Sequence, residues 1–396
     1  MTGGLSAAAG GVLSAESKHR VRQRLIDGGG RITPAAVAAA VRAESGGVVA
    51  DHELLDAIRE LDYELVGTGP LQPLLAEPAV TDVLVTAPDA VWVDRGRGLE
   101  RTAVRFPDGD AVRRLAQRLA VAAGRRLDEA VPFVDARLPD GTRLHAALPP
   151  VAADGVQLSL RVHRPAAHDL AALRSLGTFD DPIDAALRAV VAARLALLVV
   201  GGTGSGKTTL LAALLGCVDP RERIVCVEDA GELQPTHPHL VRLVTRPPNI
   251  EGAGEITLRD LLRQALRMRP DRLVVGEARG AEICELLTAL NTGHEGGAAT
   301  LHANSAHEVP ARLEALAALG GLSRPALHSQ LAAAFQVVLE VRRRTDGQRR
   351  LAAIGVLDRH DERVRIVPAW RDGVGWLDAR DRLHTLLTER GVCWSC

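Results

Sequence analysis

A glycine-rich octapeptide carries the most specific chemical signal in this sequence of 396 residues. Residues 201–208 read GGTGSGKT, which fits the pattern G-x-x-x-x-G-K-[ST], and they lie between an apolar stretch and a helical one. The glycines let backbone N–H groups converge on a phosphate, and the N-terminus of the helix adds a favourable dipole. Lys207 would contact the outer phosphates of a nucleotide, and the Thr208 hydroxyl would bind Mg²⁺.

The alternative is a glycine-rich turn that matches this pattern by chance. The motif stands, however, in the strand–loop–helix context that a P-loop requires. Lys18 and Lys207 are also the only lysines among 48 lysine and arginine residues, so a lysine at this position is unusual. The sequence therefore predicts a nucleotide-phosphate site made by Gly202, Thr203, Gly204, Ser205, Gly206, Lys207, Thr208 and Thr209.

Hydrolysis of a bound nucleotide would also need carboxylates, for Mg²⁺ and for the attacking water. One expected strand ends at Glu228, with Glu232 in the loop that follows, and a later apolar strand ends at Glu277. In a parallel sheet the carboxyl ends of the strands face the same crevice as the P-loop, so these acids can converge on the outer phosphate. The alternative is that they cap the following helices. Residue types alone leave open which of the three is the base.

Two histidines, His294 and His302, bracket a glycine-rich segment and a strand. A histidine at a strand end could sense the γ-phosphate, whereas a metal site would need a third ligand that the spacing lacks. A structural role is the remaining alternative. Cys393 and Cys396 form a Cys-x-x-Cys pair without a second pair, so we expect an exposed, frayed tail rather than a zinc or redox site.

The elements that would position these residues form two domains. From residue 182 onward, apolar strands alternate with helices, which predicts a parallel-rich sheet covered on both faces, as in RecA-like P-loop domains. Strands are expected at 196–200, 224–228, 272–276 and 298–302, helices at 208–215, 257–269 and 281–291, and added strands at 337–343, 349–356 and 364–368. The expected fold class is therefore α/β.

Upstream, the pattern predicts a smaller α+β domain over residues 67–163. Strands are expected at 80–86, 91–94, 99–105, 134–138, 143–148 and 157–162, with a helix at 108–123. A helical N-terminal segment would occupy 1–66, with the first 17 residues loose and helices at 20–27, 33–45 and 51–65. Residues 164–181 are expected to be a linker to the ATPase-like domain at 182–396.

Composition and charge narrow the classes of function. The chain is 46% hydrophobic with a net charge of −1, so it can bury large cores and has no general basic excess for nucleic acid. No apolar stretch is long enough to span a bilayer, and residues 1–17 contain no Lys or Arg, unlike a signal peptide. We therefore expect a cytoplasmic protein.

Taken together, the motifs resemble those of the type II/IV secretion ATPase superfamily, nearest to its Tad/Flp pilus assembly branch, the helicase/secretion neighbourhood ATPases. Beside the P-loop, VEDAGEL at 227–233 looks like the Asp box of the family, LRMRPDRLVVGEARG at 266–280 like its Walker B region, and 291–304 like its His box. GPLQPLL at 69–75 and DARLPDGTR at 135–143 resemble its N-terminal domain.

This resemblance implies a homohexameric ATPase motor that uses ATP and Mg²⁺ and is peripheral at the cytoplasmic face of the membrane. Its partners would be inner-membrane platform proteins, and it would act indirectly on a pilin or a secreted substrate. Arg137 and Arg143 of the flexibly joined N-terminal domain match arginines that reach the nucleotide. The resemblance also favours Glu232 as the residue that orients the water and Glu277 as a residue on the Mg²⁺ side.

Two other classes of function stay open from the residues themselves. The first is a nucleic-acid translocase, since RecA-like sheets serve both roles. Only four Phe, four Trp and one Tyr are present for base stacking, which disfavours it. The second is a nucleotide-binding regulator without turnover, against which the acids at two strand ends argue.

Overall fold

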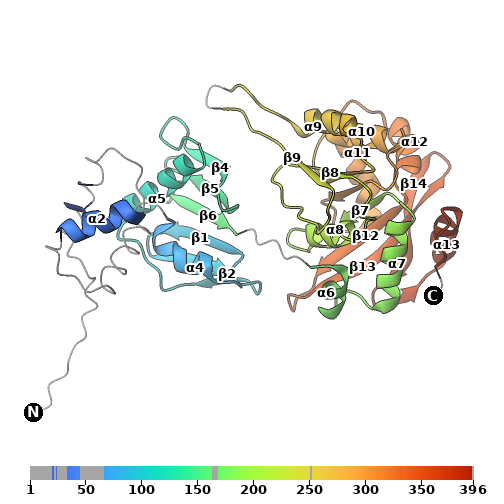
Figure 1. The fold of residues 1–396 in the computed structure, drawn as a ribbon, viewed down its shortest axis with the longest axis horizontal. Helices are drawn as coiled ribbons and strands as arrows, with labels where there is room; N and C mark the ends of the chain where they lie inside the picture. The colour runs from blue at the N-terminus through green and yellow to red at the C-terminus, as the bar shows by residue number, and fades with distance from the viewer. Residues whose placement is uncertain are drawn as a thin grey trace, which may run out of the picture. The chain divides into compact units, whose positions relative to one another are not determined.

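The computed structural model describes residues 20–21, 24, 34–44, 67–162, 168–249 and 252–394. It divides the chain into two compact units, Met1–His163 and Arg164–Cys396 (Figure 1). The expected helix at 33–45 corresponds to α2 (Pro34–Glu44). The expected loose residues 1–17, most of the expected helix at 20–27, the expected helix at 51–65, residues 164–167 of the expected linker, and Cys396 lie outside the described residues.

The first unit contains a six-stranded antiparallel sheet with the strand order β3-β2-β1-β6-β5-β4. Its strands are β1 (Asp82–Ala87), β2 (Ala90–Asp94), β3 (Leu99–Arg101), β4 (Phe133–Arg137), β5 (Arg143–Ala147) and β6 (Gln157–Arg161). The amphipathic helix α5 (Gly109–Ala122) buries Val112, Leu115 and Leu119 in the same core as the strands. The Asp108 carboxylate accepts from the Ala111 N–H at 2.7 Å and caps this helix. The predicted α+β pattern is confirmed, except that the third strand is shorter.

The hairpin of β4 and β5 is the part of this unit that carries candidate site residues. The turn between the strands contains Asp140, whose carboxylate accepts from the Thr142 N–H at 2.9 Å, and Gly141, which has a φ of +92°. These contacts explain why Pro-Asp-Gly predicts a tight turn here. The register places Arg137 directly opposite Arg143.

A short 3-10 turn and a short helix before this sheet were not expected from the pattern. They are η1 (Gly69–Leu71) and α4 (Gln72–Ala76), and they bury Leu71 and Leu74 in the same core. Both elements are shorter than the two helical turns over which an amphipathic repeat becomes visible.

The second unit contains a nine-stranded sheet with the order β15-β14-β13-β12-β7-β11-β10-β8-β9. The strands are β7 (Leu197–Val200), β8 (Ile224–Glu228), β9 (Leu240–Val244), β10 (Arg272–Ala278), β11 (Ala298–Leu301), β12 (Val337–Arg343), β13 (Arg349–His360), β14 (Arg363–Arg371) and β15 (Gly375–Trp376). Strands from β12 to β9 pair in parallel, and β13 to β15 are antiparallel additions. The predicted α/β class with a parallel-rich sheet is confirmed.

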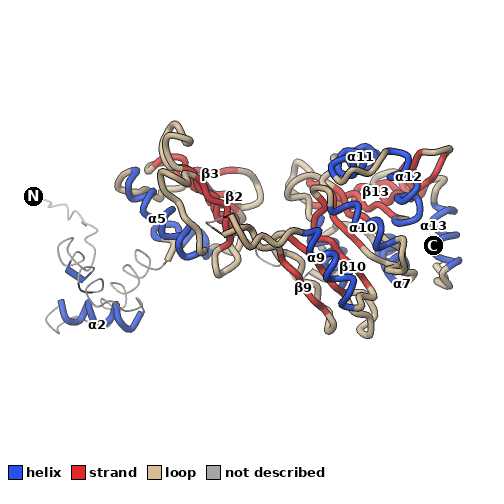
Figure 2. Tube along the Cα trace, turned by 90° about the horizontal axis from the view of Figure 1, so that it is seen from above, coloured by secondary structure: helices blue, strands red, loops and turns tan. Residues whose placement is uncertain are grey.

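Helices cover both faces of this sheet, as Figures 1 and 2 show, with α9 and α10 beside β10 in Figure 2. The helices are α6 (Leu170–Ser175), α7 (Asp181–Ala192), α8 (Lys207–Leu215), α9 (Leu258–Ala265), η2 (Leu266–Met268), α10 (Glu282–Leu290), η3 (Ala306–Glu308), α11 (Val309–Leu319), α12 (Arg324–Ala334) and α13 (Arg380–Glu389). Strand β9, helices α11 to α13 and the short β15 were not expected.

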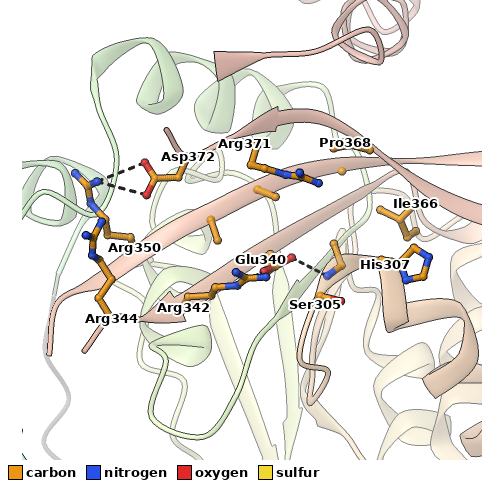
Figure 3. Close-up of a pocket in the computed structure, with 14 residues that line it drawn as sticks. Ser305, His307, Glu340, Arg342, Arg344, Arg350, Ile366, Pro368, Arg371 and Asp372 are labelled. Carbon is orange, nitrogen blue, oxygen red and sulfur yellow. Dashed lines mark hydrogen bonds and ion pairs between the residues drawn. The ribbon is translucent and has the colours of Figure 1, made fainter. Parts of the chain in front are cut away.

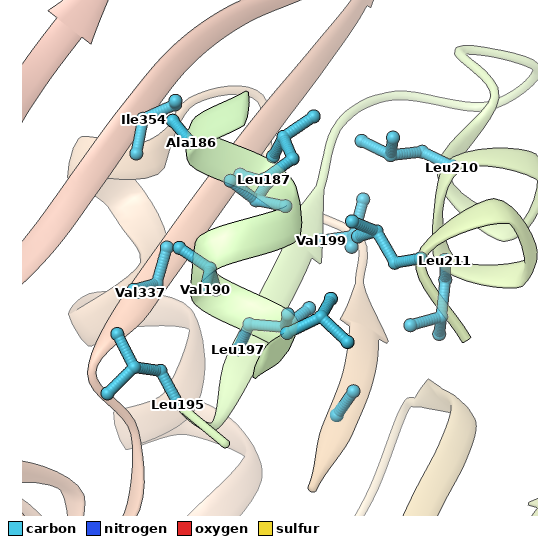
Figure 4. Close-up of a cluster of buried hydrophobic side chains, with 14 of the residues drawn as sticks. Ala186, Leu187, Val190, Leu195, Leu197, Val199, Leu210, Leu211, Val337 and Ile354 are labelled. Carbon is cyan, nitrogen blue, oxygen red and sulfur yellow. The ribbon is translucent and has the colours of Figure 1, made fainter. Parts of the chain in front are cut away.

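Strand β7, which leads into the P-loop, is buried on both faces. Leu197 and Val199 pack with α7 and α8 in one core (Figure 4), and Leu198 and Val200 belong to the core under α9 to α12. A strand covered on both sides needs no polar alternation, which is why this stretch is continuously apolar.

Two expectations about connecting segments need correction. Residues 164–181 were expected as a linker, but Asp169 caps α6, which buries Leu170 and Leu173 in the core beneath β7. The expected frayed tail is packed as far as Trp394, whose ring lies 4.9 Å from that of Trp376, although Cys393 is free and exposed. None of the described helices is both long and apolar enough to cross a bilayer.

Candidate active site

Backbone geometry at the P-loop requires glycine. At Gly201, where φ is +153°, a Cβ atom would lie 2.2 Å from the Val341 carbonyl oxygen and 2.6 Å from Ser205 Oγ, so no side chain fits. Gly204 and Gly206 have φ values of +67° and +97°, which L side chains rarely adopt. The loop therefore takes a fixed turn between β7 and α8, of the kind in which backbone N–H groups can converge on an anion.

Polar groups of this loop form a cradle that suits a phosphate. Lys207 Nζ curls back and donates to the carbonyl oxygens of Gly201 and Gly202, each at 3.0 Å. Ser205 is buried, and its Oγ has no hydrogen-bond partner among the described residues. Thr208 and Thr209 lie in the first turn of α8 and are partly exposed, and Thr203 is exposed. A buried unpaired hydroxyl beside a lysine at a helix N-terminus suits an anionic ligand.

The strand register brings most of the other candidates to the edge of the sheet that carries the P-loop. Leu301 pairs with Val200, so His302 follows β11 at the level of Gly201. Val275 pairs with Val227, so Glu277 lies near the end of β10 and Glu228 ends β8. With strands about 4.8 Å apart, β11 is one strand, β10 two strands and β8 three strands from the P-loop strand.

Glu228 is a buried carboxylate that holds the loop after its own strand. Its side chain is 3% exposed, and Oε1 accepts from the N–H groups of Glu232 and Leu233 at 2.9 and 2.8 Å. A Cβ at Gly276 would lie 2.7 Å from Glu228 Cγ, so the carboxylate packs against bare backbone of β10. Burial raises its pKa, against the opposing effect of the two N–H donors. These contacts favour Glu228 as a positioning residue for Glu232 over a direct catalytic role.

Glu228→Gln should therefore keep the fold and reduce turnover only a few-fold, because the amide oxygen can still accept both N–H bonds. The raised pKa means that the native state holds this proton to higher pH than the unfolded chain does. The free energy of unfolding of the wild type should therefore fall as pH rises from the unfolded pKa through the native pKa, and the variant should lack this contribution. Denaturant unfolding from about pH 4 to about pH 8 measures the difference.

The control is Glu228→Ala, which removes both acceptor bonds. It should unfold at lower denaturant concentration than Glu228→Gln. If Glu228→Gln were stable and folded yet lost turnover as completely as a variant of Glu277, the charge of Glu228 would take part in the chemistry and the positioning role would be wrong.

Glu277 and Glu232 are the acids that stay accessible at this edge. The Glu277 side chain is 25% exposed and forms an ion pair with Arg279. Burial opposes the charge of Arg279, but Glu277, Asp229 and Glu232 outweigh this effect and raise its pKa. Arg279 therefore lies within the field of all three acids and links the two strand ends. Glu232 is partly exposed. The structure brings these groups together as the sequence predicts.

The structure does not bring His294 to the P-loop. His294 precedes β11 and its Nδ1 lies 3.4 Å from the Pro270 carbonyl oxygen, which precedes β10, so it sits at the amino edge of the sheet. His302 follows β11 and is exposed at the carboxyl edge. The four residues of β11 separate the two histidines by about 13 Å, so His294 and His302 cannot contact the same phosphate. Of the two expected γ-phosphate sensors, only His302 lies at the edge of the P-loop.

No group of three His, Cys, Asp or Glu side chains in the described part of the chain could hold a metal ion.

Arg137 and Arg143 lie in the first unit. Arg137 Nε donates to the Gly141 carbonyl oxygen at 3.1 Å, and an Arg143 amino group lies 3.8 Å from Asp135. The register adds Arg161 of β6 opposite Arg143, so three arginines form a row across β4, β5 and β6. Like charges directly opposite one another are unfavourable in a sheet, and Asp82 of β1, opposite Arg161, and Asp135, near Arg143, supply negative charge beside this row. Sequence reasoning missed Arg161 because it ends β6, outside the β4–β5 hairpin, and only the sheet pairing places it beside Arg143.

Two further arginines beside the P-loop were also missed. Arg349 Nε donates to the Gly204 carbonyl oxygen at 3.1 Å, and Arg343 NH1 lies 3.9 Å from the position of a Cβ at Gly204. Among 46 arginines, no local signal distinguishes these two. Only the sheet order reveals them, because β12 pairs with the P-loop strand β7.

A separate cavity of about 610 Å³ lies over the antiparallel strands (Figure 3). Arg342, Arg344, Arg350 and Arg371 line it together with Glu340 and Asp372, and Ser305 to His307 form one wall. Arg342 pairs with Glu340 and Arg350 with Asp372, so carboxylates of the cavity pair with two of its four arginines. P-loop residues do not line this cavity.

Comparison with known proteins gives four results. The family model described as "Type II/IV secretion system protein" matches residues 64–361. A protein of Mycobacterium tuberculosis named for conjugal transfer is 61% identical over 349 residues, which cover 87% of this chain and 99% of that protein. Type IV secretion system protein PtlH of Bordetella pertussis is 32% identical over 334 residues, covering 77% of this chain and 94% of PtlH. The solved structure of the pilus retraction motor PilT with bound ADP shares the fold, with a TM-score of 0.50 at 20% identity over 81% of this chain and 86% of PilT.

Proposed function

The chain belongs to the type II/IV secretion system protein family, and we propose that it is an ATP-hydrolysing motor that powers a pilus or secretion machine. The observation that carries the proposal is the P-loop cradle at the same sheet edge as Glu277, Glu232 and His302. A phosphate site alone serves binding, whereas carboxylates and a histidine at neighbouring strand ends serve turnover. Release of phosphate from ATP by the purified chain tests it.

In this proposal each side chain of the site has a separate role in ATP hydrolysis. Lys207 leaves its carbonyl partners and binds the outer phosphate oxygens, and the loop N–H groups hold the phosphate chain in place. Glu232, on the loop that Glu228 positions, orients the attacking water, and His302 contacts the γ-phosphate. The Thr208 hydroxyl and the Glu277 carboxylate, both partly exposed at this edge, fit as holders of Mg²⁺, which when bound would neutralise charge on the phosphates.

The finer assignment is to Tad/Flp pilus assembly, which the combined motifs of the sequence support. We further propose a hexameric ring at the cytoplasmic face of the membrane, whose partners are inner-membrane platform proteins and in which the first unit is a separate domain. A nucleic-acid translocase is not favoured, because the net charge is −1 and aromatic residues are few.

The family resemblance assigns Arg137 and Arg143 to the nucleotide phosphates. The double variant Arg137→Ala/Arg143→Ala should therefore hydrolyse ATP about tenfold or more slowly than the wild type while keeping its fold and assembly. A charge-assisted hydrogen bond to phosphate contributes about 1.5–3 kcal/mol, and about 1.4 kcal/mol corresponds to a factor of ten. Steady-state phosphate release measures the rate, and light scattering measures the assembly.

The matched control is Arg101→Ala/Arg105→Ala, which removes two exposed arginines of the same unit that face Asp89. It should keep the wild-type rate. Equal rates in both double variants, with both folded and assembled, would show that Arg137 and Arg143 only brace their hairpin.

A further inference from the structure

The hairpin of β12 and β13 ends beside the P-loop with two arginines directly opposite each other. Glu340 of β12 pairs with Val200, the last residue before the P-loop, so the rest of β12 runs past that loop. Arg343 ends β12, Arg349 begins β13, and the register pairs them. Two like charges at this spacing are unfavourable in a sheet unless an anion lies between or beside them.

Both side chains lie over the loop itself. Arg349 donates its Nε to the Gly204 carbonyl oxygen at 3.1 Å, and its Cδ would lie 3.0 Å from a Cβ at Gly206. Arg343 NH1 lies 3.9 Å from the position of a Cβ at Gly204. Although the Arg349 side chain as a whole is exposed, packing of its guanidinium against the loop and the charge of Arg343 lower its pKa.

The next pair of arginines along the same two strands provides a contrast. Arg342 and Arg350 are also opposite each other, but they point to the other face of the sheet, into the cavity of Figure 3. There Glu340 lies 2.5 Å from Arg342, and Asp372 lies 3.4 Å from Arg350. On that face the protein supplies its own carboxylates, whereas on the P-loop face Arg349 donates to a neutral carbonyl oxygen of the phosphate cradle.

We propose that Arg343 and Arg349 bind the terminal phosphates of the nucleotide held by the P-loop of the same subunit. Arg349 exchanges the Gly204 carbonyl oxygen for a phosphate oxygen, because a bond to an ionised acceptor is about twice as strong as one to a neutral acceptor. The planar guanidinium forks suit several phosphate oxygens at once. The proposal rests on nucleotide binding at the P-loop, and it adds two ligands from the antiparallel extension of the sheet.

Titration of the full-length chain with ATP and with ADP tests this assignment. Arg343→Gln/Arg349→Gln should bind ATP about ten- to a hundredfold more weakly than the wild type, and the loss should be larger for ATP than for ADP. Arg342→Gln is the matched control, because it removes a neighbouring arginine that points to the other face. Its affinity for ATP should equal that of the wild type.

Each other outcome decides against the proposal in a recognisable way. Equal ATP affinity in the double variant and the control would overturn the proposed phosphate contacts of Arg343 and Arg349 and leave the P-loop assignment intact. Tighter binding of ATP by the double variant would mean that the hydrogen bond from Arg349 to Gly204 competes with the nucleotide, and that neither arginine binds its phosphates. A wild-type chain that binds no ATP would overturn both this proposal and the proposed function.

A measurement on the wild-type chain covers the case in which the double variant does not fold. Phenylglyoxal modifies accessible arginines, and mass spectrometry reports the extent at each position. A non-hydrolysable ATP analogue should protect Arg343 and Arg349 several-fold and leave Arg342 unchanged. Equal modification of Arg343 and Arg349 with and without the analogue would overturn the proposal.

Discussion

Lys207→Ala is expected to abolish ATP turnover, with a loss of about a thousandfold or more. In the structure Nζ is held by two P-loop carbonyl oxygens at 3.0 Å, so the ammonium already lies within the cradle where phosphates would bind. Alanine offers no hydrogen-bond donor in its place, and the positive charge that faces the outer phosphates is lost. Removal of such a charge from a phosphoryl-transfer site lowers the rate by a large factor. Steady-state phosphate release from ATP by the purified variant measures the loss.

Lys18→Ala is the natural control for this variant, because it removes the other lysine of the chain. It should hydrolyse ATP at the wild-type rate. Unfolding curves of both variants establish that they are folded. Turnover by folded Lys207→Ala at a rate near that of Lys18→Ala would mean that the loop does not serve hydrolysis.

Glu277→Gln should bind ATP with little change in affinity but hydrolyse it about a hundredfold or more slowly. The amide keeps the size of the side chain and loses the charge that Mg²⁺ or the attacking water needs, and such a group contributes about 10²–10⁴ to a rate. Loss of the charge also leaves Arg279 without its ion-pair partner, but Asp229 and Glu232 still act on it. Single-turnover hydrolysis and a separate binding titration distinguish the two effects.

Glu295→Gln serves as the control for Glu277. Glu295 is exposed before β11, at the amino edge of the sheet, where it pairs with Arg390 at 3.1 Å. This variant should keep the wild-type rate. A Glu277→Gln protein that hydrolyses ATP as fast as Glu295→Gln would reduce Glu277 to an ion-pair partner of Arg279.

Local features of the sequence predict the P-loop and its surroundings well. The glycines at 201, 204 and 206 are required by backbone geometry, and a buried parallel strand is continuously apolar, so the motif and its strand are both visible from residue types. The same holds for the hairpin that carries Arg137 and Arg143, because Asp140 and Gly141 specify its turn.

Features that depend on sheet order were not accessible to the same reasoning. His294 and His302 are eight positions apart in the sequence, yet the intervening strand sends them to opposite edges of the sheet. Arg343 and Arg349 lie far from the P-loop in sequence, and pairing of β12 with β7 brings them to it. Helix α6 falls within the expected linker because its six residues show too little periodicity to predict a helix.

The proposed function requires this chain to hydrolyse ATP at the site formed by the P-loop, Glu232 and Glu277. Its most direct test is steady-state release of inorganic phosphate by the purified full-length chain, with ATP and Mg²⁺ and again with a chelator present. We predict continuous turnover that requires Mg²⁺ and is lost in Lys207→Ala. Stoichiometric binding of ATP without turnover by the assembled, folded wild-type chain would contradict the claim and would indicate a nucleotide-binding regulator.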